Sequence, residues 1–213
     1  MKKEILDRTE SFVREYLSGV ESGHNWWHIH RVRNTAIYIH AREQQGDAFT
    51  IEMAALLHDI GDYKVKNGRK KVDLKVFLDG LKLETKQIDI IINIIDHISF
   101  RAGFGPDYEH FAELDIVQDA DRLDAIGAIG IARAFNYGGS KGNEIYDPEQ
   151  EPRNYKSADE YTRSDSSTIN HFYEKLLRLK DLMNTQTGRA LAESRHRFME
   201  DYLEQFYREW NTG

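Results

Sequence analysis

Proline, the residue that most strongly breaks helices, occurs only three times in the 213 residues of this chain. Charged side chains make up 31% of the residues and hydrophobic ones 40%, a balance that suits helices with one buried and one polar face. A chain of this length can bury one sizeable core. We therefore predict an all-α protein that forms a single domain over residues 1–213.

Apolar residues recur at helical spacing in eight segments, near residues 2–20, 25–43, 50–60, 71–80, 85–99, 110–136, 157–183 and 187–210. In the sixth segment, Gly127 and Gly130 would weaken a helix, so we expect another helix or a ligand to approach closely there. Glycine and proline also gather between Tyr137 and Tyr155. We expect a flexible loop over residues 137–155, which could act as a lid over a bound substrate.

Charge and composition exclude several kinds of protein. The formal net charge of −7 and the pI of about 5.7 disfavour binding along a nucleic-acid duplex. The absence of cysteine excludes disulfides and thiolate metal sites, which leaves His, Asp and Glu as possible ligands. The apolar stretch from Ile88 to Ile98 is too short to span a membrane, and no run of signal-peptide length follows Met1. We expect a cytoplasmic protein with no membrane partner.

The first candidate for chemistry is the pair His58-Asp59, at the end of an apolar helical segment. Adjacent helical side chains point about 100° apart, yet one ion above that edge can be reached by both. Imidazole nitrogen and carboxylate oxygen are both common metal ligands. The pair also fits a helix-end histidine beside a solvated aspartate, so it needs support from elsewhere in the chain.

A second group consists of three carboxylates in one helical segment, Asp119, Asp121 and Asp124, with Arg122 among them. Burying an unpaired carboxylate is costly, and like charges this close repel one another. A divalent cation or the arginine would relieve both problems. Alternatively, one carboxylate faces water, one pairs with the arginine and one caps a neighbouring helix.

A third group opens the second helical segment, where His24, His28 and His30 precede Arg31. His24 and His28 lie four residues apart, and His28 and Arg31 lie three apart, so each pair shares a helix face. A lone histidine at such a place is more often structural than functional. The case therefore depends on the three groups in combination.

Together these groups supply a histidine, a histidine-aspartate pair and a further aspartate from three apolar helices. Their nitrogen and oxygen donors suit Mn, Fe, Co, Zn or Ni better than calcium. With this ordered motif the chain resembles the HD-domain superfamily of metal-dependent phosphohydrolases over nearly its whole length. Trp26-Trp27-His28, the segment 119–124 and the segment 171–176 are similar to a bacterial subgroup. The resemblance implies the helical HD-domain fold.

The same resemblance implies a set of metal ligands, namely His28, His58, Asp59 and Asp121. His28 is preferred to His24 because it stands on the helix and is followed by Arg31-Val32. Asp121 is preferred to Asp119 because Arg122-Leu123 follows it. These ligands would hold one divalent ion, which could be Mn, Fe, Co, Ni, Zn or Mg, with manganese favoured.

The implied activity is hydrolysis of a phosphoester or phosphoanhydride, with a nucleoside tri- or monophosphate as the expected substrate. A bound divalent ion lowers the pKa of its water and neutralises phosphate oxygens. Asp62, four residues after His58, is the first candidate to orient that water. Asp124, three residues after Asp121, is the competing general base, or else it hydrogen-bonds to a metal ligand and orients it.

Cationic and imidazole side chains are the expected contacts for the phosphates of the substrate. Several stand close to the metal motif in the sequence, and two more form an i, i+4 pair near the C-terminus. The candidates are Arg31, Lys64, Lys70, Lys71, His97, His171 and Lys175.

Two other classes of function remain open. A regulatory module could keep the HD fold and bind a ligand without turnover, although such a module has no need of a complete ligand set and Asp62. A di-iron oxygenase would need further histidines between the His-Asp pair and the last aspartate, and His97 and His110 lie there. Two irons in each chain would favour the oxygenase.

Overall fold

The computed structural model describes residues 1–19, 25–60, 72–99, 108–157, 159–160 and 166–213. These residues form helices and connecting turns and include no strand, so the prediction of an all-α fold is confirmed. Among the described helices, none is long and apolar enough to cross a bilayer. The chain divides into two compact units, Met1–Ala120 and Asp121–Gly213. The single domain over residues 1–213 stays a prediction.

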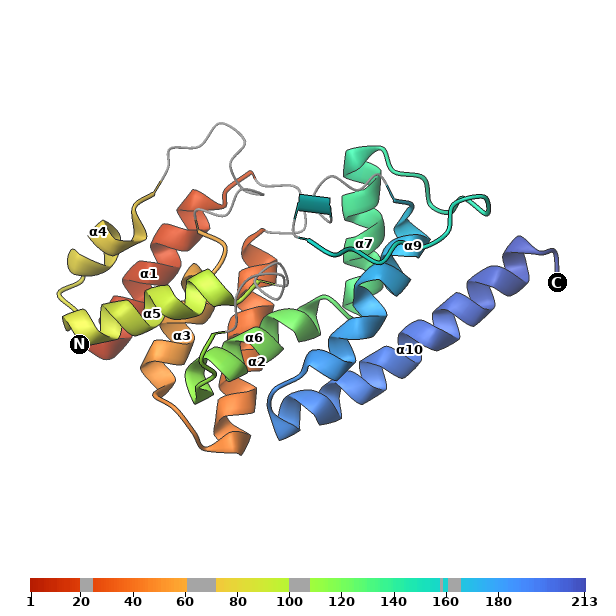
Figure 1. The fold of residues 1–213 in the computed structure, drawn as a ribbon. Coiled ribbons are helices and arrows are strands. Elements are labelled where there is room, and N and C mark those ends of the chain that lie inside the picture. The colour runs from red at the N-terminus through yellow and green to blue at the C-terminus, as the bar shows by residue number, and fades with distance from the viewer. Residues whose placement is uncertain (20–24, 61–71, 100–107, 158, 161–165) are drawn as a thin grey trace. The chain divides into compact units, whose positions relative to one another are not determined.

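In its described residues, the N-terminal unit contains five complete helices and most of a sixth, labelled in Figure 1. The complete helices are α1 (Lys2–Tyr16), α2 (Trp26–Glu43), α3 (Ala48–Leu57), α4 (Leu74–Asp79) and α5 (Thr85–His97). The sixth is α6 (Ala112–Asp124), whose last four residues belong to the C-terminal unit.

Helix α3 is the centre of the N-terminal unit, and α1, α2 and α5 all pack against it. Eight of the ten residues of α3 are buried, as expected for a helix inside a core. The core around it consists of Ile5, Val13, Leu17, Trp26, Ile29, Phe49, Met53, Leu56, Leu57, Ile60, Leu78, Leu81, Ile88 and Ile91. The end of α3 is therefore held from several directions, which suits it to position a site.

A charged network ties the helices around α3 together. Arg33 on α2 donates hydrogen bonds to Glu52 on α3 and to Glu10 on α1, the latter at 2.6 Å. Arg14 also donates to Glu10 at 2.8 Å. Burial alone would raise the pKa of Glu10, but the hydrogen bonds from the two arginines bring that pKa below its ordinary value. The network fixes the register of α2 against α3.

The C-terminal unit contains α7 (Gly127–Lys141), α9 (Thr168–Glu174), the 3₁₀ helix η3 (Leu176–Leu182) and α10 (Gln186–Trp210). Helix α10 packs against α7 and η3, and α9 packs against the same two elements. Aromatic rings from α7, α9 and α10 pack together inside the C-terminal unit. The ring centroid of Phe172 lies 6.1 Å from that of Phe135 and 5.9 Å from that of Tyr202.

The helix predicted over residues 110–136 is two helices, so that prediction was wrong in its boundaries. Helix α6 ends at Asp124, and α7 begins at Gly127, whose φ of +74° requires glycine. The close approach expected at the glycines is confirmed, since a Cβ on Gly127 would lie 3.0 Å from the Arg195 side chain of α10. A Cβ on Gly130 would lie 2.3 Å from the Ala125 carbonyl oxygen.

The loop predicted over residues 137–155 begins later than expected, because α7 continues to Lys141. Of the helical segment predicted over 157–183, the described residues 159–160, α9 and η3 are helical. The loop is bound to α9 and the residues before it: the backbone N–H of Thr168 donates to the Glu144 carbonyl, and Asn170 Nδ2 donates to the Gln150 carbonyl. Its role as a lid stays a prediction.

Candidate metal centre

His28 is placed by the N-terminal cap of α2. The side chain of Asn25 accepts hydrogen bonds from the backbone N–H groups of Trp27, at 3.1 Å, and His28, at 3.2 Å. This cap satisfies donors that a helix start would otherwise leave unpaired. It fixes the first turn of α2, and the His28 side chain on that turn is completely buried. The capping role of Asn25 was not predicted, although an asparagine just before an apolar helical run is a known start signal.

His58 and Asp59 lie in the turn that follows α3, not on the helix as predicted, because the helix ends at Leu57. The Ile60 N–H donates to the Leu57 carbonyl at 2.9 Å, which closes the turn. His58 Nδ1 lies 2.9 Å from the Ala55 carbonyl oxygen. Because a carbonyl only accepts, this contact places the proton on Nδ1 and leaves the lone pair on Nε2.

Three side chains, those of His28, His58 and Asp59, converge within the N-terminal unit. His28 Nε2 lies 3.1 Å from His58 Nε2 and 3.4 Å from Asp59 Oδ2. His58 Nε2 lies 3.6 Å from Asp59 Oδ1. The two imidazole rings meet edge to face, with an interplanar angle of 76°. Among the described residues, this is the group of histidine, aspartate and glutamate side chains with the spacing to hold a metal ion.

The three separations fit a single metal ion. Two ligands that each lie about 2.1 Å from one ion are about 3.0 Å apart at octahedral angles and about 3.4 Å apart at tetrahedral angles. The distance of 3.1 Å between the two Nε2 atoms falls between these values, and the distances of 3.4 and 3.6 Å to the two Asp59 oxygens are at or just above the larger one. Two neutral imidazoles and one carboxylate form a mixed nitrogen and oxygen set that suits a first-row divalent metal better than calcium.

Burial strengthens the case for a metal. The exposed fractions are 6% for His58 and 5% for Asp59, and His28 is fully enclosed. A buried carboxylate is costly unless a cation or several donors compensate for its charge. A divalent ion held between these three side chains would supply that compensation.

Comparison with known proteins gives the family. No family model matches the chain. The Bacillus subtilis protein YpgQ is 40% identical over 202 residues, which cover 93% of this chain and 90% of YpgQ. A crystal structure of YpgQ in complex with ADP has a TM-score of 0.75 at 37% identity, covering 96% of this chain and 97% of that one.

Two further crystal structures are similar over almost their full length. One, of a Lactobacillus plantarum protein, has a TM-score of 0.89 at 38% identity and covers 99% of this chain and 98% of that one. The other is an HD-superfamily hydrolase from Bacillus thuringiensis, with a TM-score of 0.76 at 43% identity over 100% of both chains. This chain belongs to the HD superfamily.

In this HD-superfamily chain, the fourth predicted ligand, Asp121, is half-buried on α6 and is the first residue of the C-terminal unit. Its membership of the ligand set stays a prediction. Asp124, one turn further on, is buried, and its carboxylate accepts a hydrogen bond of 2.7 Å from Arg133 of α7. No sequence signal pointed to Arg133.

Of the residues predicted to contact substrate, Arg31 is half-buried on α2, one turn beyond His28. His97 is the last residue of α5, and its Nδ1 lies 2.8 Å from the Asn93 carbonyl oxygen. That contact leaves Nε2 as the atom for a ligand. In the C-terminal unit, His171 on α9 and Lys175 at its end are both half-buried.

Four predicted residues lie outside the described part of the chain, namely Asp62, Lys64, Lys70 and Lys71. His110, considered for a second metal, lies 2.6 Å from Asp115 through Nδ1 and is exposed. Neither His110 nor His97 joins a group of three possible ligands within the described residues.

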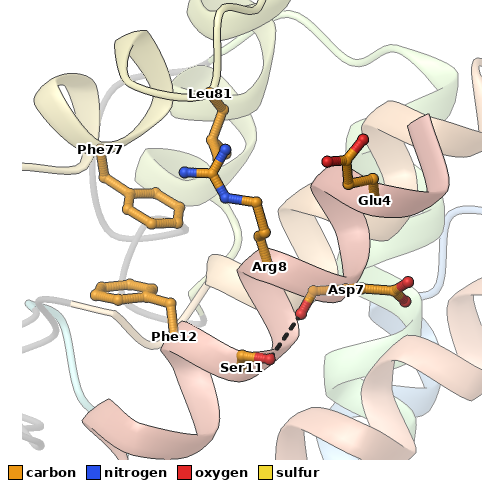
Figure 2. A pocket seen from close by; sticks show the side chains of 7 residues that line it. All are labelled: Glu4, Asp7, Arg8, Ser11, Phe12, Phe77 and Leu81. Carbon is orange, nitrogen blue, oxygen red and sulfur yellow. Dashed lines mark hydrogen bonds between the residues drawn. The ribbon is translucent and has the colours of Figure 1, made fainter. Parts of the chain in front are cut away.

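A separate groove of about 410 Å³ lies on the N-terminal unit between α1 and the end of α4 (Figure 2). The rings of Phe12 and Phe77 stack across it with centroids 4.2 Å apart, and Arg8 extends from α1 toward Leu81. None of the predicted site residues that the structure describes lines this groove. It is therefore distinct from the metal centre.

Proposed function

We propose that this protein is a metal-dependent phosphohydrolase that cleaves a phosphoester or phosphoanhydride bond of a nucleotide. The observation that carries the proposal is the buried convergence of His28, His58 and Asp59. Membership of a superfamily that includes hydrolases supports the reaction class.

One divalent ion is the cofactor in this proposal, with manganese favoured and Asp121 as its fourth ligand. His28 and His58 would bind it through Nε2, and Asp59 through its carboxylate. When bound, the ion supplies a water of lowered pKa and neutralises phosphate oxygens. Asp121 is proposed because Arg122-Leu123 follows it, as in the family motif.

Residues of the chain would accept the proton and bind the phosphates of the substrate. Asp62 is the proposed group that accepts the proton of the attacking water. Arg31, one turn along α2 from His28, is proposed to bind phosphate oxygens by paired N–H donors. His97, His171 and Lys175 supply further proposed phosphate contacts, together with Lys64, Lys70 and Lys71.

A nucleotide is the proposed substrate because YpgQ, 37% identical in the structural comparison, was crystallised in complex with ADP. ADP carries both a phosphoester and a phosphoanhydride bond. Its presence in YpgQ supports a nucleotide in this chain and fits either hydrolysis or binding.

The test is release of phosphate and pyrophosphate from a panel of nucleoside mono-, di- and triphosphates with manganese present. Asp59→Asn should abolish release, because it removes the one carboxylate of the three-residue group. Asp89→Asn is the matched control, since Asp89 is exposed on α5. Nucleotide binding without release in the unaltered protein would replace the hydrolase with a binding module. Two irons per chain would favour an oxygenase.

A further inference from the structure

Asp124 occupies an unfavourable place for a carboxylate. It is the last residue of α6, where the helix dipole is negative and the final carbonyl groups lack partners within the helix. Its exposed fraction is only 4%. A buried negative charge at a helix C-terminus requires cationic partners nearby.

Arg133 of α7 supplies one such partner. Its Nη1 donates to Asp124 Oδ2 at 2.7 Å and to the Asp124 backbone carbonyl at 3.1 Å. One guanidinium nitrogen therefore neutralises the side chain and also caps the end of α6. The pairing joins the helix that carries Asp121 to the helix that follows it.

Arg195 of α10 supplies a second cation at the same corner. Its Nη1 donates to the Leu123 carbonyl near the end of α6, which also accepts from the Ile126 backbone N–H at 3.4 Å. Burial lowers the pKa of Arg195, and the negative charge of Asp124 opposes that shift. The absence of a side chain on Gly127 is what allows Arg195 to approach, because a Cβ there would lie 3.0 Å from the arginine.

A general base needs a lone pair directed at its water. The Oδ2 atom of Asp124 instead accepts a hydrogen bond of 2.7 Å from Arg133. Asp121 lies three residues earlier, on the same face of the same helix. A shift of the last turn of α6 would therefore move Asp121 with it.

We propose that Asp124 is a positioning residue rather than the general base: with Arg133 it fixes the last turn of α6 and so the orientation of Asp121. This inference rests on the proposed function for its link to metal binding and catalysis. It leaves Asp62 as the proton acceptor.

The test compares Asp124→Asn, Arg133→Ala and the double variant in the full-length protein. Arg197→Ala is the control, because Arg197 forms only an exposed i, i+4 pair with Glu193 on α10. Three quantities are measured: the melting temperature, the affinity for Mn²⁺, and the pH profile of kcat/KM with the nucleotide that is hydrolysed best.

A positioning role predicts that both single variants behave alike. Each should lower the melting temperature by about 10 °C, since each breaks a buried ion pair. Each should weaken Mn²⁺ binding by roughly 10- to 100-fold, which is the usual effect of removing a residue that orients a metal ligand. The double variant should lose less than the sum of the two, and Arg133→Lys should recover part of the loss.

The proposal is overturned if Asp124→Asn lowers kcat more than 100-fold and removes the acidic limb of the pH profile of kcat/KM, while Arg133→Ala keeps the kcat and the pH profile of the unaltered protein. Additive effects of the two variants on melting temperature, or unchanged Mn²⁺ affinity in both, would also overturn it. If no nucleotide is hydrolysed, the proposed function fails, but the melting and Mn²⁺ measurements still decide the role of Asp124.

Discussion

Asp59→Asn is the sharpest test of the metal centre, because it changes charge and hardly changes shape. Asp59 is the only acidic member of the buried group with His28 and His58. Its oxygens lie 3.4 and 3.6 Å from the two Nε2 atoms. Asparagine would keep the packing of the turn after α3 but would offer a neutral, weaker ligand atom.

The expected effect can be worked out from ligand linkage. With Mn²⁺ at 100 times its Kd, binding stabilises the folded protein by about 2.7 kcal/mol. For a chain of 213 residues, each kcal/mol raises the melting temperature by about 2–4 °C, so the unaltered protein should gain about 5–11 °C. If Asn weakens binding about 100-fold, the same Mn²⁺ concentration adds only about 0.4 kcal/mol, or about 1 °C.

The assay is thermal unfolding of protein first freed of metal by a chelator and then titrated with Mn²⁺. Asp89→Asn serves as the control, because this exposed carboxylate of α5 should not affect the gain. The unsubstituted protein and this control should melt higher by the same amount. Asp59→Asn without metal should still unfold cooperatively, which separates loss of the ion from loss of the fold.

An equal gain in Asp59→Asn and in the unaltered protein would refute the reasoning, since the ion would then be bound elsewhere. No gain in either protein at millimolar Mn²⁺ would remove manganese as the favoured ion. Titration with Fe²⁺, Co²⁺, Ni²⁺ and Zn²⁺ would then decide whether the site prefers another metal.

Three further predictions concern the surrounding structure. Gly127→Ala should lower the melting temperature by about 5 °C, because its φ of +74° costs alanine about 1–2 kcal/mol and its Cβ would meet a side chain of α10; Gly139→Ala, with open space around it, should cost nothing. Glu10→Gln should make the free energy of unfolding depend less on pH in the acid range. The pKa of Glu10 is lowered in the folded state, so its charged form stabilises the fold above the ordinary value of 4.5. This stabilisation is lost as the pH falls through the lower folded value. An unchanged acid profile would remove this contribution. Glu174→Gln should lower the free energy of unfolding by about 1–3 kcal/mol in denaturant titration, because its buried carboxylate accepts three hydrogen bonds; Tyr155→Phe, which removes one of them, should cost less, and the reverse order would contradict this account.

The candidate metal ligands of the N-terminal unit could be predicted because several weak signals occur together in the sequence. His58 and Asp59 close a segment too apolar to be exposed, and His28 opens a helix whose buried face it shares with Val32. Polar groups that interrupt such segments need partners in the core. The choice of His28 among the neighbouring histidines, by contrast, depended on the family resemblance and not on spacing.

The corner between α6 and α7 was beyond sequence reasoning because apolar spacing continues across it. Leu123, Ile126 and Ile131 are all buried, and nothing in their order marks the break. The positive φ of Gly127 becomes evident only in three dimensions. Arg133 and Asp124 are nine residues apart, a separation that brings no two side chains together on one helix.

The misplaced start of the loop after α7 has a similar physical cause. Gly138 and Gly139 favoured a loop from residue 137 onward, yet both belong to the helix. A Cβ on Gly138 would lie 2.2 Å from Thr168 Oγ1 at the start of α9. Glycine at 138 therefore permits close packing of α9 on α7, a tertiary requirement that outweighs its weak helix propensity.

The end of α3 brings two neighbouring residues to His28. The helix ends at Leu57, and His58, which follows it, keeps helical backbone angles of φ −59° and ψ −30°. Atoms of His58 and Asp59 both lie within 3.4 Å of His28 Nε2. The last turn of α3 also provides the Ala55 carbonyl that fixes the tautomer of His58. The helix end thus supplies both side chains of the pair and the carbonyl that leaves the lone pair of His58 on Nε2.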